Sequence, residues 1–395
     1  MEVLFVSHKF PPSTGGMEKQ CYELVTGMEK RCKVHRLVYE RKENKLLFFL
    51  SLQRKIKKIC TEHPGIDIIH FNDALIGTFC SFQKQNKRIS YVVTLHGLDV
   101  VFPSAFYHKY IFKRLNRFSR MIAVSRATAE QAIALGIDPE KIMVVPNGVD
   151  VSVSRGETAG TFEQWLTEKQ IDLAGKKLLM MLGRPVERKG FSWFAGRVFP
   201  KIKENYFLVI AGPFHRKPTM QERLIELLPK SLREKALLFW GCFSDEKNLR
   251  GLLVQSLNIR HLGHLSSSEL KLLFRNADAF LMPNIHVEGD MEGFGLVCLE
   301  ASVQGALVFA SQIDGIPDAI QDGKNGFLLP PKDASAWTNK LDDFAQNTDA
   351  YKQYQSRFSQ FTKDNYHWER MVDGYYEAFL KTINDDKFGK SLTFF

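Results

Sequence analysis

Short apolar runs alternate with longer segments of helical periodicity along the whole chain. Each run is almost continuously apolar, which is the pattern of strands buried on both faces of a parallel sheet. The runs fall into two sets, on either side of a polar stretch near residues 150–175. The first set is Val3–Val6, Val34–Tyr39, Ile66–Phe71, Tyr91–Leu95, Met121–Val124 and Ile142–Val145. The second set is Leu178–Leu182, Phe207–Ala211, Leu237–Trp240, Ile259–Leu262, Ala279–Met282, Ala306–Ala310 and Gly326–Leu329.

The two sets predict an α/β protein with two Rossmann-like, doubly wound parallel-sheet domains that face each other across a cleft. The expected boundaries are residues 1–152 for the first domain and 176–367 for the second. Residues 153–175 are polar and rich in Ser and Gly, so they are expected to form a linker with a short helix near Phe162–Glu168. Such sheets bind ligands beyond the carboxyl ends of their strands.

Positive charge is concentrated in the first part of the 395-residue chain. The formal net charge is +10, and residues 1–150 contain 23 Lys and Arg against 14 Asp and Glu, a net +9. This asymmetry indicates an anionic partner for the first domain, namely a nucleic acid, a membrane surface or an acidic substrate. The charged share of 25% and apolar share of 44% exclude wholesale disorder.

Targeting signals are absent from the sequence pattern. The opening apolar run follows Glu2 and stops at Ser7, so no signal peptide is expected. No apolar stretch approaches the roughly 18 residues that span a bilayer. The six cysteines form no CxxC pair and no metal-like spacing, which favours reduced thiols in a cytoplasmic protein.

Two loops of the first domain follow predicted strands. Gly15 and Gly16 open a helix, and paired glycines at a helix N-terminus let a ligand approach the backbone closely. The loop lacks the GxGxxG dinucleotide pattern, and an ordinary βα connection would have the same composition. In Thr94-Leu95-His96-Gly97-Leu98-Asp99, His96 either points into the cleft toward a hydroxyl or phosphate, or bonds the local backbone.

Cations gather in the loop after Leu178–Leu182, which reads Gly183-Arg184-Pro185-Val186-Glu187-Arg188-Lys189-Gly190. Arg184 and Lys189 would leave the strand end toward one point. A planar Arg fork with a Lys point charge suits a diphosphate. Arg188 is expected to face solvent. The alternative is a solvated surface loop.

The most specific motif is Glu292-Gly293-Phe294-Gly295-Leu296-Val297-Cys298-Leu299-Glu300. Its glycines allow a tight loop, and a helix is expected to begin near Gly295 with its free N–H groups toward a phosphate. Glu300 would lie roughly 7–8 Å further along at about 1.5 Å per residue, so the two carboxylates could reach opposite ends of an extended ligand. Carboxylates accept hydrogen bonds from sugar and ribose hydroxyls. The alternative is a helix-capping Glu and an unrelated buried acid.

A metal reading of the same segment is also open, because Glu288, Asp290 and Glu292 alternate along it. Arg184 and Lys189 supply the positive charge that a metal would otherwise bring, so no metal is expected. Two weaker candidates, Gly212 and Leu265, follow predicted strands where a base and a ribose would lie.

Several motifs in order carry a family resemblance. They are Gly15-Gly16, His96, Pro146-Asn147-Gly148-Val149-Asp150, Gly183-Arg184 with Lys189-Gly190, Leu262-Gly263, and Glu292 with Glu300. The chain resembles the family 4 retaining glycosyltransferases (glycosyl transferases group 1) of the GT-B fold over essentially its whole length. The resemblance implies a nucleotide-sugar donor on the second domain, an acceptor on the first, and a last helix, about 368–395, that packs back on the first domain.

The resemblance also implies roles for individual residues. Arg184 and Lys189 contact the donor diphosphate, Glu292 the transferred sugar and Glu300 the ribose. The expected catalytic residues are Glu292, His96, Arg184 and Lys189. The expected donor-binding residues are Gly15, Gly16, Arg184, Lys189, Gly212, Leu265, Phe294, Gly295, Leu296 and Glu300. The expected acceptor-binding residues are His96, Gly97 and Asp99, and no cofactor is expected.

Three segments depart from the family pattern. Gly212-Pro213-Phe214-His215 lacks the usual glycine-rich continuation, and Trp240-Gly241-Cys242 has no obvious counterpart. Asp314 stands where a Glu is usual. These departures concern the base and sugar pockets and leave the diphosphate and carboxylate positions intact.

Two basic segments of the first domain show helical spacing. In Leu46–Cys60 the apolar positions are Phe49, Leu52, Ile56 and Ile59, beside Arg54, Lys55, Lys57 and Lys58. In Phe106–Phe118 they are Tyr107, Ile111, Leu115 and Phe118, beside Lys109, Lys113, Arg114 and Arg117. Such amphipathic helices suit an anionic membrane surface or a lipid-linked acceptor. The alternative is a core-facing stripe with a solvated basic face, and no nucleic-acid-binding motif is present.

The sequence therefore predicts a metal-independent, retaining, hexosyltransferase-type enzyme, cytoplasmic and peripheral on the inner face of the membrane. It would transfer a sugar from a nucleotide-diphosphate sugar to a hydroxyl of a lipid-linked, polysaccharide or lipopolysaccharide glycan. One alternative is a transferase with a small soluble acceptor, a saccharide or sugar phosphate. A second is a catalytically silent nucleotide-sugar binding protein.

Overall fold

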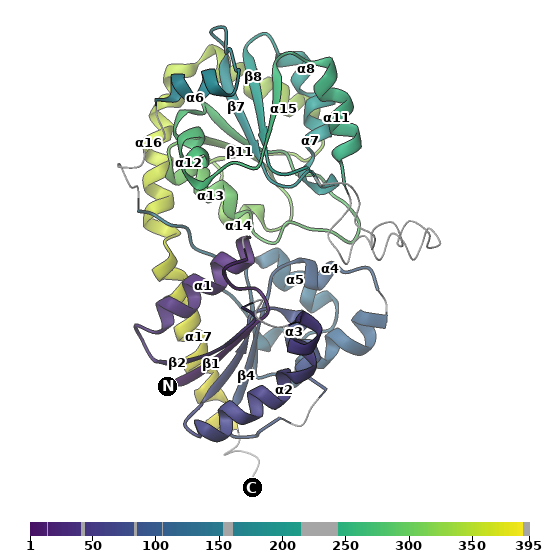
Figure 1. Ribbon diagram of the computed structural model, residues 1–395, viewed down its shortest axis with the longest axis vertical. Coiled ribbons are helices and arrows are strands. Elements are labelled where there is room, and N and C mark those ends of the chain that lie inside the picture. Colours follow the sequence, from purple (N-terminus) through teal and green to yellow (C-terminus); the bar gives the residue numbers. More distant parts are fainter. Residues whose placement is uncertain are drawn as a thin grey trace. The chain divides into compact units, whose positions relative to one another are not determined.

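The computed structural model describes residues 1–13, 15–40, 44–82, 85–104, 106–152, 161–214 and 244–389. The chain divides into two compact units, Met1–Gly148 with Tyr366–Phe395, and Val149–Asn365. Within the described residues, each unit is built on one six-stranded parallel sheet covered by helices (Figure 1). The predicted pair of Rossmann-like α/β sheets is confirmed.

The first unit has the strand order β2-β1-β3-β4-β5-β6, in which every pair is parallel. Its strands are β1 (Glu2–Ser7), β2 (Lys33–Val38), β3 (Ile68–Phe71), β4 (Ser90–Leu95), β5 (Arg120–Ala123) and β6 (Ile142–Val144). Its α-helices are α1 (Gly16–Met28), α2 (Lys45–Glu62), α3 (Ala74–Cys80), α4 (Leu98–Val101), α5 (Arg126–Ala134) and α17 (Trp368–Gly389). The π-helical turn η1 (Tyr107–Ile111) and the 3₁₀ turns η2 (Phe112–Arg117) and η3 (Pro139–Lys141) complete it.

Alternation along the strands explains why helices cover both faces of this sheet, since successive side chains point to opposite sides. His70 of β3 meets the ring of Phe379 on α17, whereas the next residue, Phe71, stacks on Phe118 beyond η2. On the α17 side, a buried polar chain links the elements: His70 Nε2 to Thr94, Thr94 to the Tyr375 hydroxyl, and the Gln20 amide to the same hydroxyl. The C-terminal helix α17 therefore packs on α1 and the sheet of the first unit (Figure 1).

The second unit has the strand order β12-β11-β10-β7-β8-β9, again parallel throughout. Its strands are β7 (Lys177–Leu182), β8 (Tyr206–Ala211), β9 (Ile259–Gly263), β10 (Ala279–Met282), β11 (Leu307–Ser311) and β12 (Phe327–Leu329). Its helices are α6 (Phe162–Glu168), α7 (Phe191–Arg197), α8 (Phe199–Ile202), α11 (Glu246–Gln255), α12 (Ser267–Asn276), α13 (Leu296–Val303), α14 (Ile316–Ala319), α15 (Ala334–Gln346) and α16 (Thr348–Asn365), with the 3₁₀ turn η4 (Glu187–Lys189).

The same alternation operates in the second unit. Phe280 of β10 packs edge-on against Phe274 of α12, while Leu281 joins the core formed with α7, α8 and α15. Local sequence fixes the helix starts: Ser266 and Glu269 form a reciprocal capping box before α12, and Asp333 caps α15. No helix within the described ranges is long and apolar enough to cross a membrane.

The predicted strands coincide with the observed ones to within a residue or two. The exception is Leu237–Trp240, which lies outside the described residues. The helix expected near Phe162–Glu168 is α6, with the same bounds. Parallel strands buried on both faces leave the strongest pattern in a sequence, which is why these elements were predictable.

The expected amphipathic stripes face the protein core. On α2, Leu52 and its neighbour Phe48 are fully buried, and the equivalent stripe after Phe106 buries Leu115 and Phe118. The second segment is a π-helical turn followed by a 3₁₀ turn rather than one α-helix. Leu52, Leu115 and Phe118 are therefore core residues, and the other expected apolar positions of both stripes are only partly buried.

Candidate active site

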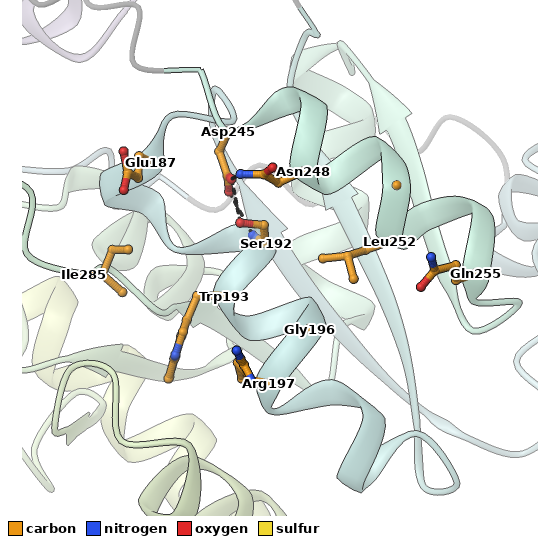
Figure 2. Close-up of a pocket in the computed structure, with 11 residues that line it drawn as sticks. Glu187, Ser192, Trp193, Gly196, Arg197, Asp245, Asn248, Leu252, Gln255 and Ile285 are labelled. Carbon is orange, nitrogen blue, oxygen red and sulfur yellow. Dashed lines mark hydrogen bonds between the residues drawn. The ribbon is translucent and has the colours of Figure 1, made fainter. Parts of the chain in front are cut away.

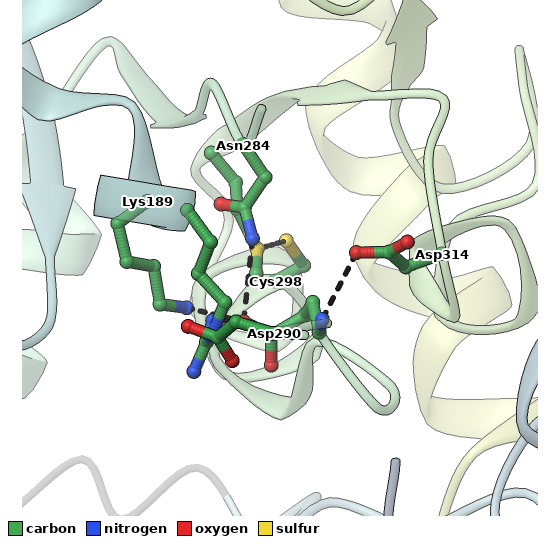
Figure 3. A network of polar contacts seen from close by, with 8 residues as sticks. Lys189, Asn284, Asp290, Cys298 and Asp314 are labelled. Atoms are coloured by element: carbon green, nitrogen blue, oxygen red, sulfur yellow. Dashed lines mark hydrogen bonds and ion pairs between the residues drawn. The ribbon is translucent and has the colours of Figure 1, made fainter. Parts of the chain in front are cut away.

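Polar side chains converge at the carboxyl ends of the neighbouring strands β7 and β10 in the second unit (Figure 3). Lys189 and Arg188 lie in η4, in the loop that follows β7. Asn284, Asp290 and Glu292 lie in the loop between β10 and α13. The carboxyl ends of adjacent parallel strands lie at one edge of a sheet, so residues about 100 positions apart in sequence come into contact.

Glu292 is the centre of this cluster. Its Oε2 accepts from Lys189 Nζ at 2.7 Å, from Arg188 Nη1 at 2.5 Å and from Asn284 Nδ2 at 3.3 Å. Arg188 Nε also lies 3.0 Å from Asp290 Oδ1. Two cations and two carboxylates therefore balance in a site where the ion-paired side chains are 12–16% exposed.

The backbone of Glu292 is fixed by the loop after β11. Its N–H donates to Asp314 Oδ2 at 3.0 Å, and its carbonyl accepts from Gly315 N–H at 2.9 Å. Asp314 has a left-handed backbone, with φ of +53°. The residue that departs from the family pattern thus positions the central carboxylate.

Gly190 lets the turn η4, which contains Arg188 and Lys189, pack closely against the residue that follows β10. It has φ of +66°, and a Cβ there would lie 2.0 Å from the carbonyl oxygen of Pro283. Only glycine combines that backbone conformation with such a close approach. Because Lys189 precedes Gly190, this contact places the lysine beside the β10 loop.

The charges shift the acid–base properties of the cluster. Burial alone would raise the pKa of Glu292, but Lys189 and Arg188 outweigh burial and lower the pKa to about 2. Burial lowers the pKa of Lys189, and Glu292 opposes that effect. Burial also raises the pKa of Asp290. Glu292 is therefore a carboxylate throughout the neutral range and serves as a hydrogen-bond acceptor.

Arg188 does not lie in the environment that the sequence predicted for it. Arg188, expected to face solvent, is partly buried and binds both Asp290 and Glu292, so that expectation is wrong. Arg184 is exposed, and within the described residues its guanidinium has no hydrogen bond or ion pair. The structure thus brings Lys189 together with Glu292 but does not join Arg184 to them.

The other predicted donor residues of the second unit lie at the start of α13 and after β8 and β9. Gly295, with φ of +91°, precedes α13, Leu296 begins that helix, and Glu300 lies in its second turn. Phe294 is buried beside them. Gly212 follows β8 with φ of +137°, and a Cβ there would lie 1.9 Å from the Gly183 carbonyl. Leu265 is buried between β9 and α12.

In the first unit, the predicted residues gather at the ends of β1, β3 and β4. His96 Nε2 donates to the Asn72 carbonyl at 2.7 Å, and its N–H donates to Asp99 Oδ2 at 2.9 Å. Gly97 precedes α4 with φ of +112°. Gly15 and Gly16 begin α1, and a Cβ on Gly15 would meet the carboxylate of Glu18.

Burial controls ionisation in this group. It lowers the pKa of His96, which therefore has a neutral ring with Nε2 protonated and Nδ1 available as an acceptor. Burial and the nearby Asp73 raise the pKa of Asp99 to about 7. Asp73 itself lies 3.0 Å from His8 Nδ1. Burial opposes ionisation of Asp73, but His8 outweighs it and lowers the pKa.

Sequence reasoning missed several residues of both groups. In the second unit these are Asn284 and Asp314, and the pairing of Arg188 with Asp290. In the first unit they are His8, Asn72 and Asp73, although Asn72-Asp73 directly follows a predicted strand and could have been found by the rule that located His96. The side-chain amide of Asn72, 1% exposed, has no hydrogen-bond partner among the described residues.

An open pocket of about 450 Å³ lies elsewhere on the second unit, between α7 and α11 (Figure 2). Its lining includes Glu187, Ser192, Trp193, Asp245, Leu252 and Ile285. Ser192 donates to Asp245 from both its hydroxyl, at 2.5 Å, and its backbone N–H, at 2.9 Å. None of the predicted site residues is among those that line this pocket.

The two six-stranded parallel sheets and their helices place the chain in the GT-B class of α/β folds. The crystal structure of Anabaena Alr3699/HepE in complex with UDP and glucose has this fold in common with the chain. The TM-score is 0.65 at 19% identity, over 95% of this chain and 98% of that one.

Within that class, the chain belongs to the family of glycosyl transferases group 1, whose sequence profile matches residues 163–363. The profile of Glycosyltransferase Family 4 matches residues 14–153. The resemblance inferred from the motifs is confirmed.

Curated relatives vary in what they are named for. The putative colanic acid biosynthesis glycosyltransferase WcaL of Salmonella typhimurium is 27% identical over 71% of this chain and 61% of its own length. The alpha-maltose-1-phosphate synthase of Mycolicibacterium smegmatis is 22% identical over 83% of this chain and 84% of its own length. The chain spans about six-tenths of the length of the first curated relatives that it matches.

Proposed function

We propose that this chain is a retaining glycosyltransferase that moves a sugar from a nucleoside-diphosphate sugar to a hydroxyl of a glycan acceptor. The observation that carries the proposal is Glu292, held by Lys189 and Arg188 in the loop that leads into α13. A carboxylate acceptor beside cations and a helix N-terminus suits a sugar linked to a diphosphate. Alr3699/HepE, which has this fold, is seen with UDP and with glucose, and this supports a nucleotide-sugar donor.

The leaving diphosphate is the group that this site would stabilise. As the bond to the anomeric carbon breaks, negative charge develops on the diphosphate and the sugar becomes oxocarbenium-like. Arg184 is exposed and unpaired within the described residues, and so is available to an incoming phosphate. Lys189 lies at the other end of the same loop. Removing one such contact typically costs about 3–4 kcal/mol, or 10²–10³ in rate.

The proposed reaction is attack on the same face of the sugar, with the leaving phosphate oxygen taking the proton of the acceptor hydroxyl. Glu292, with its strongly lowered pKa, is suited to bind sugar hydroxyls and not to deliver a proton. Glu300 would accept from the ribose. Arg184 and Lys189 would supply the positive charge that the diphosphate requires, without a metal.

The first unit is the proposed acceptor side. His96, neutral and with Nδ1 able to accept, would bind an acceptor hydroxyl near the reacting centre, with Gly97 and Asp99 beside it. Gly15 and Gly16 would let the donor approach the start of α1.

A thermal-shift screen against a panel of nucleoside-diphosphate sugars tests the donor proposal. A bound donor stabilises the folded chain by mass action, so one class of nucleotide should raise Tm and the others should not. The selected donor is then used in a transfer assay. Glu292→Ala should abolish transfer while donor-free circular dichroism stays native. Full activity in that variant would overturn the site assignment.

We propose that the acceptor is lipid-linked and that the first unit meets an anionic membrane surface. The named relative WcaL, assigned to colanic acid biosynthesis, supports a polysaccharide-type acceptor. Leu46, Leu47 and Leu50 at the start of α2 are 67%, 58% and 66% exposed, followed by the exposed cations Arg54, Lys57 and Lys58. Exposed leucines beside cations are the combination that inserts at an anionic interface.

Sedimentation with vesicles tests this surface. The chain should pellet with vesicles that contain anionic lipid and stay in the supernatant with neutral ones. Leu46→Ser combined with Leu47→Ser and Leu50→Ser should release it. Leu257→Ser, at a 97% exposed leucine of the second unit, is the matched control and should bind like the unmodified chain.

The soluble-acceptor alternative is favoured if no vesicle binding occurs. The relative alpha-maltose-1-phosphate synthase supports it, because its name indicates a sugar phosphate product. The transfer assay then uses sugar phosphates as acceptors. A catalytically silent binder would show donor-dependent Tm shifts with no transfer to any acceptor and no slow hydrolysis of the donor.

A further inference from the structure

Two histidines and a glutamate meet at the other end of the first sheet. Glu2 is the first residue of β1, His35 lies in the edge strand β2, and His63 directly follows α2. One ligand atom from each of the three residues can be chosen so that all lie within 4.8 Å of one another. We propose that Glu2, His35 and His63 form a binding site for a borderline divalent metal ion of the Zn²⁺ type.

The geometry fits three protein ligands around one ion. Zn²⁺ binds imidazole nitrogen at about 2.0–2.1 Å and carboxylate oxygen at about 2.0–2.2 Å, so tetrahedral ligands lie roughly 3.4 Å apart. His35 Nε2 and Glu2 Oε1 are 2.6 Å apart, and small side-chain adjustments would open that contact around an ion. Two imidazoles and one carboxylate with an open fourth position make a common zinc ligand set.

The packing of the two imidazole rings also favours a metal. The rings of His35 and His63 stack with centroids 4.1 Å apart, at an interplanar angle of 29°. The two imidazoles are therefore side by side, and one nitrogen of each lies within 4.8 Å of a carboxylate oxygen of Glu2. Nitrogen ligands select Zn²⁺-type ions over Mg²⁺ and Ca²⁺.

Lys33 is the group that competes for Glu2. Its Nζ lies 3.2 Å from Glu2 Oε1, and its side chain is 63% exposed while those of Glu2 and His35 are each 14% exposed. The lysine can therefore turn into solvent when a cation enters. Asp67 also lies nearby but accepts the backbone N–H of Glu2, so it orients the glutamate.

The position of the site assigns it a structural role. β2 is the edge strand of the sheet and pairs with β1, and α2 lies between β2 and β3 in the chain, so an ion would tie the end of α2 to this edge of the sheet. Glu2 begins β1 and the His8 group follows its end, about 20 Å away for a six-residue strand. Metal binding should therefore raise stability without altering the reacting groups.

Metal titration of the full-length chain, stripped with chelator, tests the proposal. Zn²⁺ should bind with one equivalent per chain and raise Tm. Co²⁺ should show the visible absorption of a tetrahedral or five-coordinate site that Zn²⁺ then displaces. Mg²⁺ and Ca²⁺ should leave Tm unchanged. Failure of the unmodified chain to bind either Zn²⁺ or Co²⁺ at near-stoichiometric concentration would overturn the proposal.

Variants assign the binding to these residues. His35→Ala with His63→Ala should reduce affinity for Zn²⁺ more than 100-fold, and Glu2→Gln should reduce it about 10- to 100-fold. Thermal melts in chelator check that each variant is folded. His286→Ala, at an exposed histidine of the second unit, is the control and should retain the site. Unchanged stoichiometry and affinity in the double variant would place the metal elsewhere, for instance on cysteines, and overturn the assignment.

Discussion

Glu292 shares one oxygen among Lys189, Arg188 and Asn284, so the charge of this single residue organises the proposed donor site. Glu292→Gln keeps the shape of the side chain and removes the charge that balances two partly buried cations. We expect transfer to fall by about 10²–10³, because an interaction with the reacting sugar is lost. Initial rates measure this loss. Thermal melts should also show destabilisation, because an ion pair broken from one side leaves uncompensated charge.

The matched control is Glu288→Gln, an exposed acid in the same loop. It should leave both rate and Tm unchanged. Equal rates for the two variants would contradict the role of Glu292.

Asp99 gives a pH-dependent prediction at the residue scale. Burial and Asp73 raise its pKa to about 7 from an ordinary value of 3.8. Between about pH 4 and 7 the unfolded chain has released this proton while the folded chain still holds it. This residue therefore makes the protein less stable as pH rises through that window. Asp99→Asn removes this pH-dependent loss of stability, while the amide oxygen still accepts a hydrogen bond from the His96 N–H.

Thermal melts of Asp99→Asn and the unmodified chain across pH 4–8 check this. The variant should be more stable at pH 7.5 by at least about 1 kcal/mol, after discounting for partial exposure, and equal in stability near pH 4. A difference in Tm that does not change with pH would contradict the raised pKa of Asp99.

Individual residues were predictable where a motif placed them at a strand end, and not where the path of a turn decides their direction. Lys189 was singled out because its loop follows a predicted strand, and Glu292 because of its motif with Gly293 and Gly295, and the structure brings the two side chains together. Arg188 was assigned to solvent, since its pairing depends on how η4 turns at Gly190 and on an acid about 100 residues away. The hydrogen bond that Asp314 accepts from the Glu292 N–H was also not predictable, because it forms only when the loop after β11 lies beside Glu292.

At the scale of elements, the connection from η4 to α7 positions Lys189, the lysine proposed to bind the donor. Gly190 has φ of +66° and lies against the Pro283 carbonyl, so Gly190→Ala should strain the backbone and also displace the turn. Gly175 has φ of +75° with nothing within 4 Å of an added Cβ, which makes it a matched control. Gly175→Ala should cost about 1–2 kcal/mol through its backbone alone.

Gly190→Ala should cost more than that and should also lower kcat/KM by displacing Lys189, whereas Gly175→Ala should leave kcat/KM unchanged. Chemical denaturation and steady-state kinetics of both variants measure the difference. Equal loss of stability, with no kinetic effect at Gly190, would show that the approach to Pro283 does not position the turn.

The sequence predicted the positions of the strands, but it did not predict which apolar residues of α2 are exposed. A buried parallel strand leaves a continuous apolar run, so the positions of the strands follow from the hydrophobic pattern of the sequence alone. A helical apolar stripe has the same spacing whether it faces a core or a membrane. On α2 the stripe holds Leu52 in the core, while the leucines that precede it are exposed. The exposure of a side chain depends on the tertiary structure, so the sequence alone could not separate the buried apolar residues of α2 from the exposed ones.

At the scale of the whole molecule, charge divides between the two units. The net +9 of residues 1–150 belongs to the first unit. In the second unit, the cations Arg188 and Lys189 are balanced by the carboxylates of Asp290 and Glu292. The donor should therefore bind the second unit by displacing internal ion pairs, and an anionic surface should bind the first unit by its excess charge. The two interactions should respond differently to salt, with vesicle binding the more strongly screened.

Hydrogen exchange on the full chain tests this division of roles. A nucleoside diphosphate chosen by the thermal-shift screen should slow exchange in the segments 183–191 and 284–300, because ligand contact at Lys189, Glu292 and the start of α13 suppresses local opening. The segment 46–62, which contains the exposed leucines of α2, should slow only when anionic vesicles are added. Protection of segment 46–62 by the nucleotide alone, with none at 284–300, would contradict the proposed donor unit.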